Sequence, residues 1–147
     1  MYGVRTEIEI NSSSERVWSI LTNFPDYGSW NPFVTSISGR AHAGERLTIS
    51  ISHRAGKRIV FRPKVLVAIP ESELRWMGRV LVPGIFDGEH YFRVVPIGSN
   101  RVLFIHGEIF SGLLAGVMKS SLSRELKLGF GSMNHALKAR AEALATE

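Results

Sequence analysis

Three ionisable residues, His90, His106 and Glu108, lie among aromatic residues in the second half of the sequence. Imidazole and carboxylate groups exchange protons near neutral pH and also ligate metals. Apolar and polar residues alternate around each of the three, and this alternation places all of them on the apolar side of a strand. An ionisable group on an apolar face needs a partner, because burying it alone is costly.

Three interpretations of this trio follow from the residue types. The side chains could hydrogen-bond to one another as a buried network. They could instead line a ligand cavity and orient the polar end of an apolar molecule. They could also bind a metal or exchange protons with a substrate, although they come from separate strands without the local spacing of a metal motif. The sequence alone leaves all three open.

The composition excludes several other kinds of chemistry. The chain of 147 residues has no cysteine, so it has no disulfide, no thiolate nucleophile and no cysteine-ligated zinc. It also has no Gly-x-Ser-x-Gly motif and no glycine-rich phosphate-binding loop. We therefore assign no catalytic residue and expect neither a metal nor a cofactor.

The net charge of +5 raises the question of an anionic partner. Nucleic acids and anionic membranes both attract basic proteins. The sequence has no basic run and no recognition motif, so we interpret the excess as an ordinary basic surface and expect no nucleic-acid partner.

The distribution of apolar residues indicates where the protein resides. A hydrophobic content of 44% and a charged content of 21% are typical of a soluble globular protein. No apolar run is long enough to span a membrane, and the N-terminal residues lack the apolar segment of a signal peptide. We therefore expect a cytoplasmic protein.

The elements that must position the trio begin with an alternating strand over Val4–Ile10. Ser12–Glu15 then has the spacing of a capping box, and an apolar helical face follows that ends at Pro25. The next stretch, Phe24–Phe33, holds four aromatic residues and two prolines. It predicts a turn or a single helical turn that either plugs one end of the core or covers a cavity.

Six further strands are predicted, each bounded by Gly, Pro, Asn or Ser. They span Val34–Ser38, Arg46–His53, Arg58–Ile69, Glu73–Val82, Phe86–Val95 and Arg101–Phe110. Short connections make the sheet antiparallel. From about Leu113 onward, apolar residues recur at spacings of three and four, which predicts one long amphipathic helix. The order predicts a single α+β domain over residues 1–147, with helices on one side of the sheet.

This order of elements resembles the helix-grip fold of the START-like superfamily, also called SRPBCC. The matching segments are Phe24–Phe33, Glu73–Trp76, Phe86–Phe92, His106–Gly112 and Met133–Lys138, and they are most similar to the polyketide cyclase/dehydrase-like branch. The resemblance implies a curved antiparallel sheet of about seven strands around the C-terminal helix. It also implies one or two short helices after the first strand and an apolar cavity between sheet and long helix.

Mapped onto this sequence, the resemblance implies a cavity lined by three parts of the chain. The lining would be Trp30 and Phe33 from the aromatic segment, Trp76, His90, Phe92, His106, Glu108 and Phe110 from the sheet, and Leu114, Met118 and Leu122 from the long helix.

The resemblance implies binding or transport of a small hydrophobic molecule, such as a lipid, an isoprenoid or an aromatic polyketide. The alternative is a cyclase or dehydratase that uses His90, His106 and Glu108, and we favour binding over catalysis. The superfamily includes both carriers and enzymes, so the fold does not decide between them. The chain would act as a monomer or homodimer, and a transient contact with a membrane surface stays open.

Overall fold

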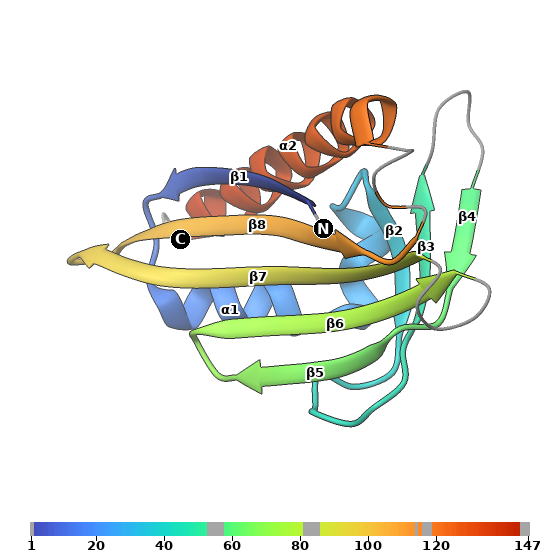
Figure 1. The fold of residues 1–147 in the computed structure, drawn as a ribbon. Coiled ribbons are helices and arrows are strands. Elements are labelled where there is room, and N and C mark those ends of the chain that lie inside the picture. The colour runs from blue at the N-terminus through green and yellow to red at the C-terminus, as the bar shows by residue number, and fades with distance from the viewer. Residues whose placement is uncertain (1, 53–57, 81–85, 114, 116–118, 145–147) are drawn as a thin grey trace.

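The chain forms two antiparallel sheets, with helices against one face of the larger sheet (Figure 1). The computed structural model describes residues 2–52, 58–80, 86–113, 115 and 119–144. The order of elements is β1 (Tyr2–Ile10), α1 (Ser14–Thr22), the 3-10 helix η1 (Phe24–Ser29), β2 (Val34–Ser38), β3 (Thr48–Ser52), β4 (Arg58–Phe61), β5 (Lys64–Ile69), β6 (Glu73–Val80), β7 (Phe86–Gly98), β8 (Arg101–Ser111) and α2 (Lys119–Leu144).

The larger sheet has the strand order β1-β8-β7-β6-β5, and the smaller sheet has the order β2-β3-β4. Every paired strand is antiparallel to its neighbour. The larger sheet curves, and both α1 and α2 lie behind it in Figure 1. The predicted α+β fold, a curved antiparallel sheet with a long C-terminal helix against it, is confirmed.

The strand register aligns the inner-face residues of the larger sheet into rows. One row runs from Val4 through Glu108, His90 and Trp76 to Val65. The adjacent row runs Thr6, His106, Phe92 and Leu74. Two of the three candidate residues are therefore cross-strand neighbours, and the third lies one row away.

The N-terminus of α1 differs from the predicted capping box. Ser13, not Ser12, is the N-cap residue, and its Oγ accepts a hydrogen bond from the backbone N–H of Arg16 at 3.1 Å. The helix therefore begins one residue later than the spacing from Ser12 to Glu15 predicts. The aromatic segment forms η1, as the prediction of a single helical turn requires, and the buried Tyr27 hydroxyl donates to the Leu21 carbonyl.

The long helix α2 buries the predicted apolar stripe. Phe130, Met133, Leu137 and Ala141 are fully buried, and the helix packs on β1, β8 and α1. Gly129 lies in the same stretch, and a Cβ there would come within 2.5 Å of the Phe33 ring. The glycine thus allows the aromatic segment to approach the helix closely.

Two sequence predictions about these elements were wrong. The single strand predicted over Arg58–Ile69 is two strands, β4 and β5, which belong to different sheets. Pro63 lies between them, and proline cannot donate to a strand ladder. The long helix was predicted from about Leu113, but α2 spans Lys119–Leu144, and Leu113 is 79% exposed.

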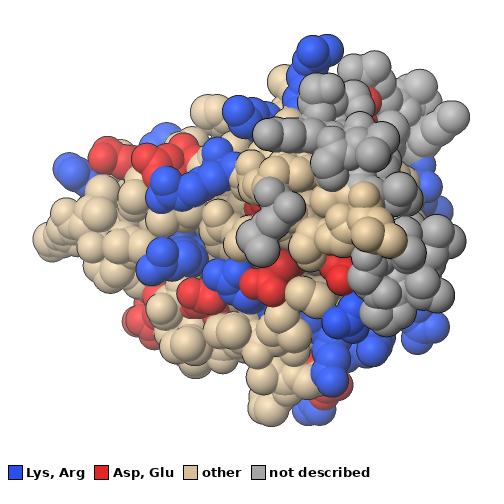
Figure 2. Space-filling view, viewed as in Figure 1, with Lys and Arg blue, Asp and Glu red and all other residues tan. Residues whose placement is uncertain are grey.

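The outer face of the larger sheet carries basic residues, and acidic residues are interspersed with them (Figure 2). Arg75 pairs with Glu73 at 3.0 Å and with Glu89 at 2.6 Å, and it lies over the Tyr91 ring. Arg79 lies 3.7 Å from Asp87. This face is therefore a mixed, solvated surface, which is how the excess basic charge was interpreted.

Candidate functional site

Five side chains, four from the inner face of the larger sheet and one from α2, form one hydrogen-bonded chain that we call the buried network: Glu108, His90, His106, Asn134 and Thr6. Glu108 Oε1 lies 3.1 Å from His90 Nδ1, and the two histidine Nε2 atoms are 2.7 Å apart. His106 Nδ1 lies 2.9 Å from Asn134 Oδ1, and Asn134 Nδ2 lies 2.9 Å from Thr6 Oγ1. The trio therefore pairs with itself, and β1 and α2 supply its remaining partners.

A main-chain carbonyl sets the direction of the hydrogen bonds in this network. The carbonyl oxygen of His106 can only accept, and the Thr6 hydroxyl donates to it at 2.9 Å. The Thr6 oxygen is then left to accept from the Asn134 amide, which turns the Asn134 carbonyl oxygen toward the His106 ring. His106 therefore carries its proton on Nδ1, and its Nε2 accepts a hydrogen bond from His90.

The environment of His106 keeps this ring neutral. Burial lowers the pKa of His106 well below its ordinary value of 6.5, and the charge of His90 lowers it further, while the Asn134 hydrogen bond opposes both. His90 directs its Nε2 proton toward His106, and its Nδ1 faces Glu108 Oε1 at 3.1 Å. Glu108 is therefore the carboxyl group at which the hydrogen-bonded chain ends.

The middle of the network is more buried than its ends. His106 is fully buried, and His90 and Asn134 are each 3% exposed, whereas the Glu108 side chain keeps 17% of its surface exposed and Thr6 is half-buried. Gly88 leaves room for Glu108, because a Cβ there would collide with Glu108 Oε2. Glu108 is therefore the ionisable member of the network that can meet another molecule.

Aromatic rings enclose the two histidines. Trp76 stacks on His90 with ring centroids 5.2 Å apart and an angle of 16°. Phe130 stacks on His106 at 4.0 Å and 14°, and Phe92 contacts both imidazoles. Phe130 and Asn134 come from one face of α2, because residues four apart in a helix are neighbours. The rings exclude water and strengthen the hydrogen bonds between the polar groups.

Three aromatic donors are buried without a hydrogen-bond partner in the described part of the chain. They are the indole nitrogens of Trp30 and Trp76 and the hydroxyl of Tyr2. The Tyr2 ring stacks on Phe110, and burial, followed by the negative charge of Glu108, raises the pKa of Tyr2. Tyr2 on β1 and Trp76 on β6 therefore lie on the two strands that border the β8–β7 pair carrying Glu108 and His90.

The structure describes most of the residues that were predicted to line a cavity. Trp76, His90, Phe92, His106 and Phe110 are buried on the inner face, Phe33 is buried against Phe130, and Trp30 is half-buried. Leu114, Met118 and the side chain of Leu122 lie outside the described residues.

Sequence reasoning missed three residues of this site: Tyr2, Thr6 and Asn134. The alternation of the first strand assigns Thr6 to the inner face, but a lone threonine is an ordinary strand residue. Helical periodicity sets Asn134 among the polar residues between apolar positions, yet it is 3% exposed. For Tyr2 and Thr6, the alternation of apolar and polar residues in the first strand is the signal that places them on the inner face.

Two features are absent from the described residues. They contain no cluster of three histidine or acidic side chains arranged to hold a metal ion. Within the same residues, no helix is both long and apolar enough to cross a membrane.

Comparisons with known proteins connect this geometry to a family. A family model described as "polyketide cyclase / dehydrase and lipid transport" matches residues 1–142. No curated protein matches the sequence significantly.

Solved structures share the fold at low sequence identity. A START superfamily protein from Mycobacterium smegmatis is 21% identical, with a TM-score of 0.77 over 98% of this chain and 99% of that one. A protein from Thermus thermophilus is 17% identical, with a TM-score of 0.75 over 97% and 99%. An aromatase/cyclase from a Streptomyces species is 14% identical, with a TM-score of 0.77 over 96% and 93%. At these identities the likeness establishes the helix-grip fold.

Proposed function

The chain belongs to the polyketide cyclase/dehydrase and lipid transport family, and on that premise we propose that it binds a small hydrophobic molecule with an oxygen acceptor at its polar end. One observation carries this proposal: the buried donors Trp76 Nε1 and Tyr2 OH have no partner among the described residues. A buried donor without a partner is costly, and a ligand oxygen would remove that cost.

The apolar part of the ligand would contact the aromatic residues of the inner face. Trp76, Phe92 and Phe110 are three buried aromatic residues of this face. Each Å² of apolar surface removed from water contributes about 25 cal/mol before the cost of association is subtracted. Lipids, isoprenoids and aromatic polyketides all supply such a surface, and those that carry a ketone, hydroxyl or carboxyl oxygen suit the free donors.

The polar end of the ligand would meet Trp76, Tyr2 and Glu108 and not the two histidines directly. Both ring nitrogens of His90 and of His106 already have partners in the buried network. His90 would act through Glu108, because its Nδ1 lies 3.1 Å from the carboxylate and holds it in place, and His106 would act through His90. This refines the expectation that all three side chains touch the ligand.

A second candidate function, a cyclase or dehydratase, is favoured by the contact between Glu108 and His90. Enolisation of a ketone needs a base at the carbon-bound proton and a donor at the developing oxyanion. Glu108 would accept the proton, and Trp76 Nε1 would donate to the oxygen. His90 would hold the Glu108 carboxyl in position for this transfer, because its Nδ1 lies 3.1 Å from Glu108 Oε1.

Native mass spectrometry of protein purified from cells tests the binding proposal. We expect a co-purified apolar ligand on the wild type and less of it on Trp76→Phe, which keeps an aromatic ring at this position but removes the free donor. Trp18→Phe, at a partly buried tryptophan on α1, is the matched control and should retain the ligand. Repeated absence of any ligand from the wild type, or equal retention by both variants, would contradict the proposal.

Glu108→Gln separates carrier from enzyme once a ligand has been identified. Glutamine keeps the shape of the side chain but cannot act as a carboxylate base. A carrier variant should still bind the ligand, whereas an enzyme variant should bind it and lose turnover, by roughly 100-fold or more for a general base. Unchanged conversion of the ligand by Glu108→Gln would eliminate the catalytic role of this residue.

A further inference from the structure

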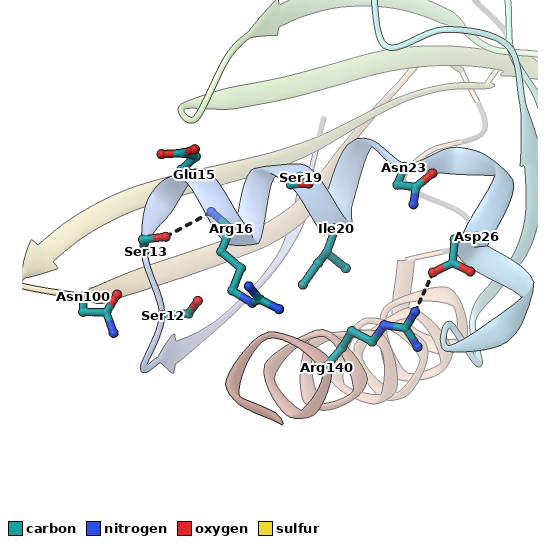
Figure 3. Close-up of a pocket in the computed structure, with 10 residues that line it drawn as sticks. All are labelled: Ser12, Ser13, Glu15, Arg16, Ser19, Ile20, Asn23, Asp26, Asn100 and Arg140. Carbon is teal, nitrogen blue, oxygen red and sulfur yellow. Dashed lines mark hydrogen bonds and ion pairs between the residues drawn. The ribbon is translucent and has the colours of Figure 1, made fainter. Parts of the chain in front are cut away.

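A separate cleft of about 590 Å³ lies between α1 and the C-terminal half of α2 (Figure 3). None of its lining residues belongs to the buried network. The lining consists of Ser12, Ser13, Glu15, Arg16, Ser19, Ile20, Asn23, Asp26, Asn100 and Arg140.

Arg16 supplies hydrogen-bond donors in this cleft. Its side chain extends from α1 toward α2, and its Nε donates to the carbonyl oxygen of Ala141 at 3.1 Å (Figure 3). No residue that the structure describes bonds to its two terminal nitrogens. The bond to Ala141 therefore holds the guanidinium in position while its terminal donors stay available to an oxyanion.

Ser12 supplies an independent observation at the same cleft. It is 1% exposed, and its Oγ has no hydrogen-bond partner in the described residues. The neighbouring hydroxyl of Ser13 serves as the helix cap, so Ser12 is not needed for that role. A buried hydroxyl without a partner costs free energy, and a ligand atom in the cleft would remove that cost.

Among the residues that the structure describes, the Arg16 guanidinium has no ion-pair partner in the cleft. Arg140 pairs with Asp26 at 2.6 Å, so these two residues neutralise each other. Glu15 is exposed, and Figure 3 shows its carboxylate on the side of α1 that faces away from Arg16. The N-terminus of α1 adds a partial positive charge beside Ser12.

We infer that this cleft binds the oxyanion of a small molecule, a carboxylate or a phosphate, through Arg16 and Ser12. The guanidinium takes two oxygens of the anion, and the Ser12 hydroxyl donates to one of them. The cleft has more volume than a lone anion fills, so the anion is a terminal group of a larger molecule. Ile20 provides an apolar wall for the rest of that molecule, and Asn23 and Asn100 provide polar contacts.

Amide NMR of the full chain tests this inference with two probes, inorganic phosphate and acetate, each added at constant ionic strength. We expect saturable shifts around Ser12, Arg16 and Asn100, and the stronger probe identifies the class of oxyanion. Arg16→Gln should weaken binding by about tenfold or more, since it removes a charge-assisted bond. Arg5→Gln is the matched control, because Arg5 is 58% exposed on β1 and its loss changes the net charge equally.

Ser12→Ala provides a second test that does not depend on the folding of the Arg16 variant. It should raise the melting temperature without anion, because it removes a buried hydroxyl without a partner, and it should reduce the stabilisation by anion. Shifts that do not saturate, or equal weakening by Arg16→Gln and Arg5→Gln, would overturn the inference. Trp76→Phe should leave anion binding unchanged, so this site and the proposed apolar site can fail separately.

Discussion

The Nε2 atoms of His90 and His106 lie 2.7 Å apart in the interior of the protein, so one of them must carry a proton and the other must accept it. The carbonyl oxygen of His106 decides which ring carries this proton. It accepts from the Thr6 hydroxyl, which in turn accepts from the Asn134 amide, so the Asn134 oxygen faces His106 Nδ1. The proton lies on His90, and the backbone of His106 thereby sets the tautomer of its own side chain.

His106→Phe should destabilise the protein by about 1–3 kcal/mol, because it leaves His90 and Asn134 without a partner. Phenylalanine suits the aromatic surroundings, so the loss reports the hydrogen bonds and not the packing. Chemical denaturation measures the effect. The double variant with Asn134→Leu should recover part of the loss, since it removes one of the two unpaired groups. A His106→Phe protein as stable as the wild type would show that the network contributes nothing to stability.

Stability should fall as the pH drops below about 6.5, the ordinary pKa of histidine. His106 has a lowered pKa in the folded protein, so over this range the unfolded chain binds a proton that the folded chain does not. The contribution is fully present above the unfolded pKa and is lost progressively toward the lower folded value, with a slope of up to about 1.4 kcal/mol per pH unit.

Urea unfolding between pH 7.5 and 5 should show this loss in the wild type and a smaller slope in His106→Phe. His135→Gln is the matched control, because it also removes one histidine, but at an exposed position. Equal pH slopes in the wild type and His106→Phe would rule out His106 as the source.

Two glycines of α2 offer a paired test of the contact between the aromatic segment and the helix. A Cβ at Gly129 would come within 2.5 Å of the buried Phe33 ring, whereas a Cβ at Gly131 would meet nothing within 4 Å. Gly129→Ala should therefore cost about 1–3 kcal/mol from overpacking. Gly131→Ala should stabilise by up to about 1 kcal/mol, since alanine favours the helix. Similar changes in melting temperature for both variants would contradict the close approach of Phe33.

Phe130 should be among the residues that contribute most to stability, because it is fully buried and stacks on His106. Phe130→Ala should cost about 3–5 kcal/mol in chemical denaturation. Lys127→Ala on the exposed side of α2 should stay within about 0.5 kcal/mol. Lys138 is less suitable as the control, because its Nζ donates to the Glu9 carbonyl and pairs with Glu142 at 2.6 Å.

Local patterns predicted much of the fold correctly. Val34–Ser38 was predicted with the bounds of β2, and the α2 stripe from Phe130 to Ala141 followed from helical spacing. The prediction failed at Pro63, where one alternating run became strands of two different sheets. Alternation reports the side on which a residue lies, but not which sheet its strand joins.

The sequence by itself determined that His90, His106 and Glu108 share the inner face, because side chains of a strand alternate with a period that depends only on the local backbone. Only the tertiary structure decided their partners. Thr6 and Asn134 lie 100 and 28 positions from His106 along the chain, and both reach it only after β1 pairs with β8 and α2 packs on the sheet. The protonation of the network follows from those long-range contacts, because a hydrogen bond requires its donor and acceptor within about 3 Å.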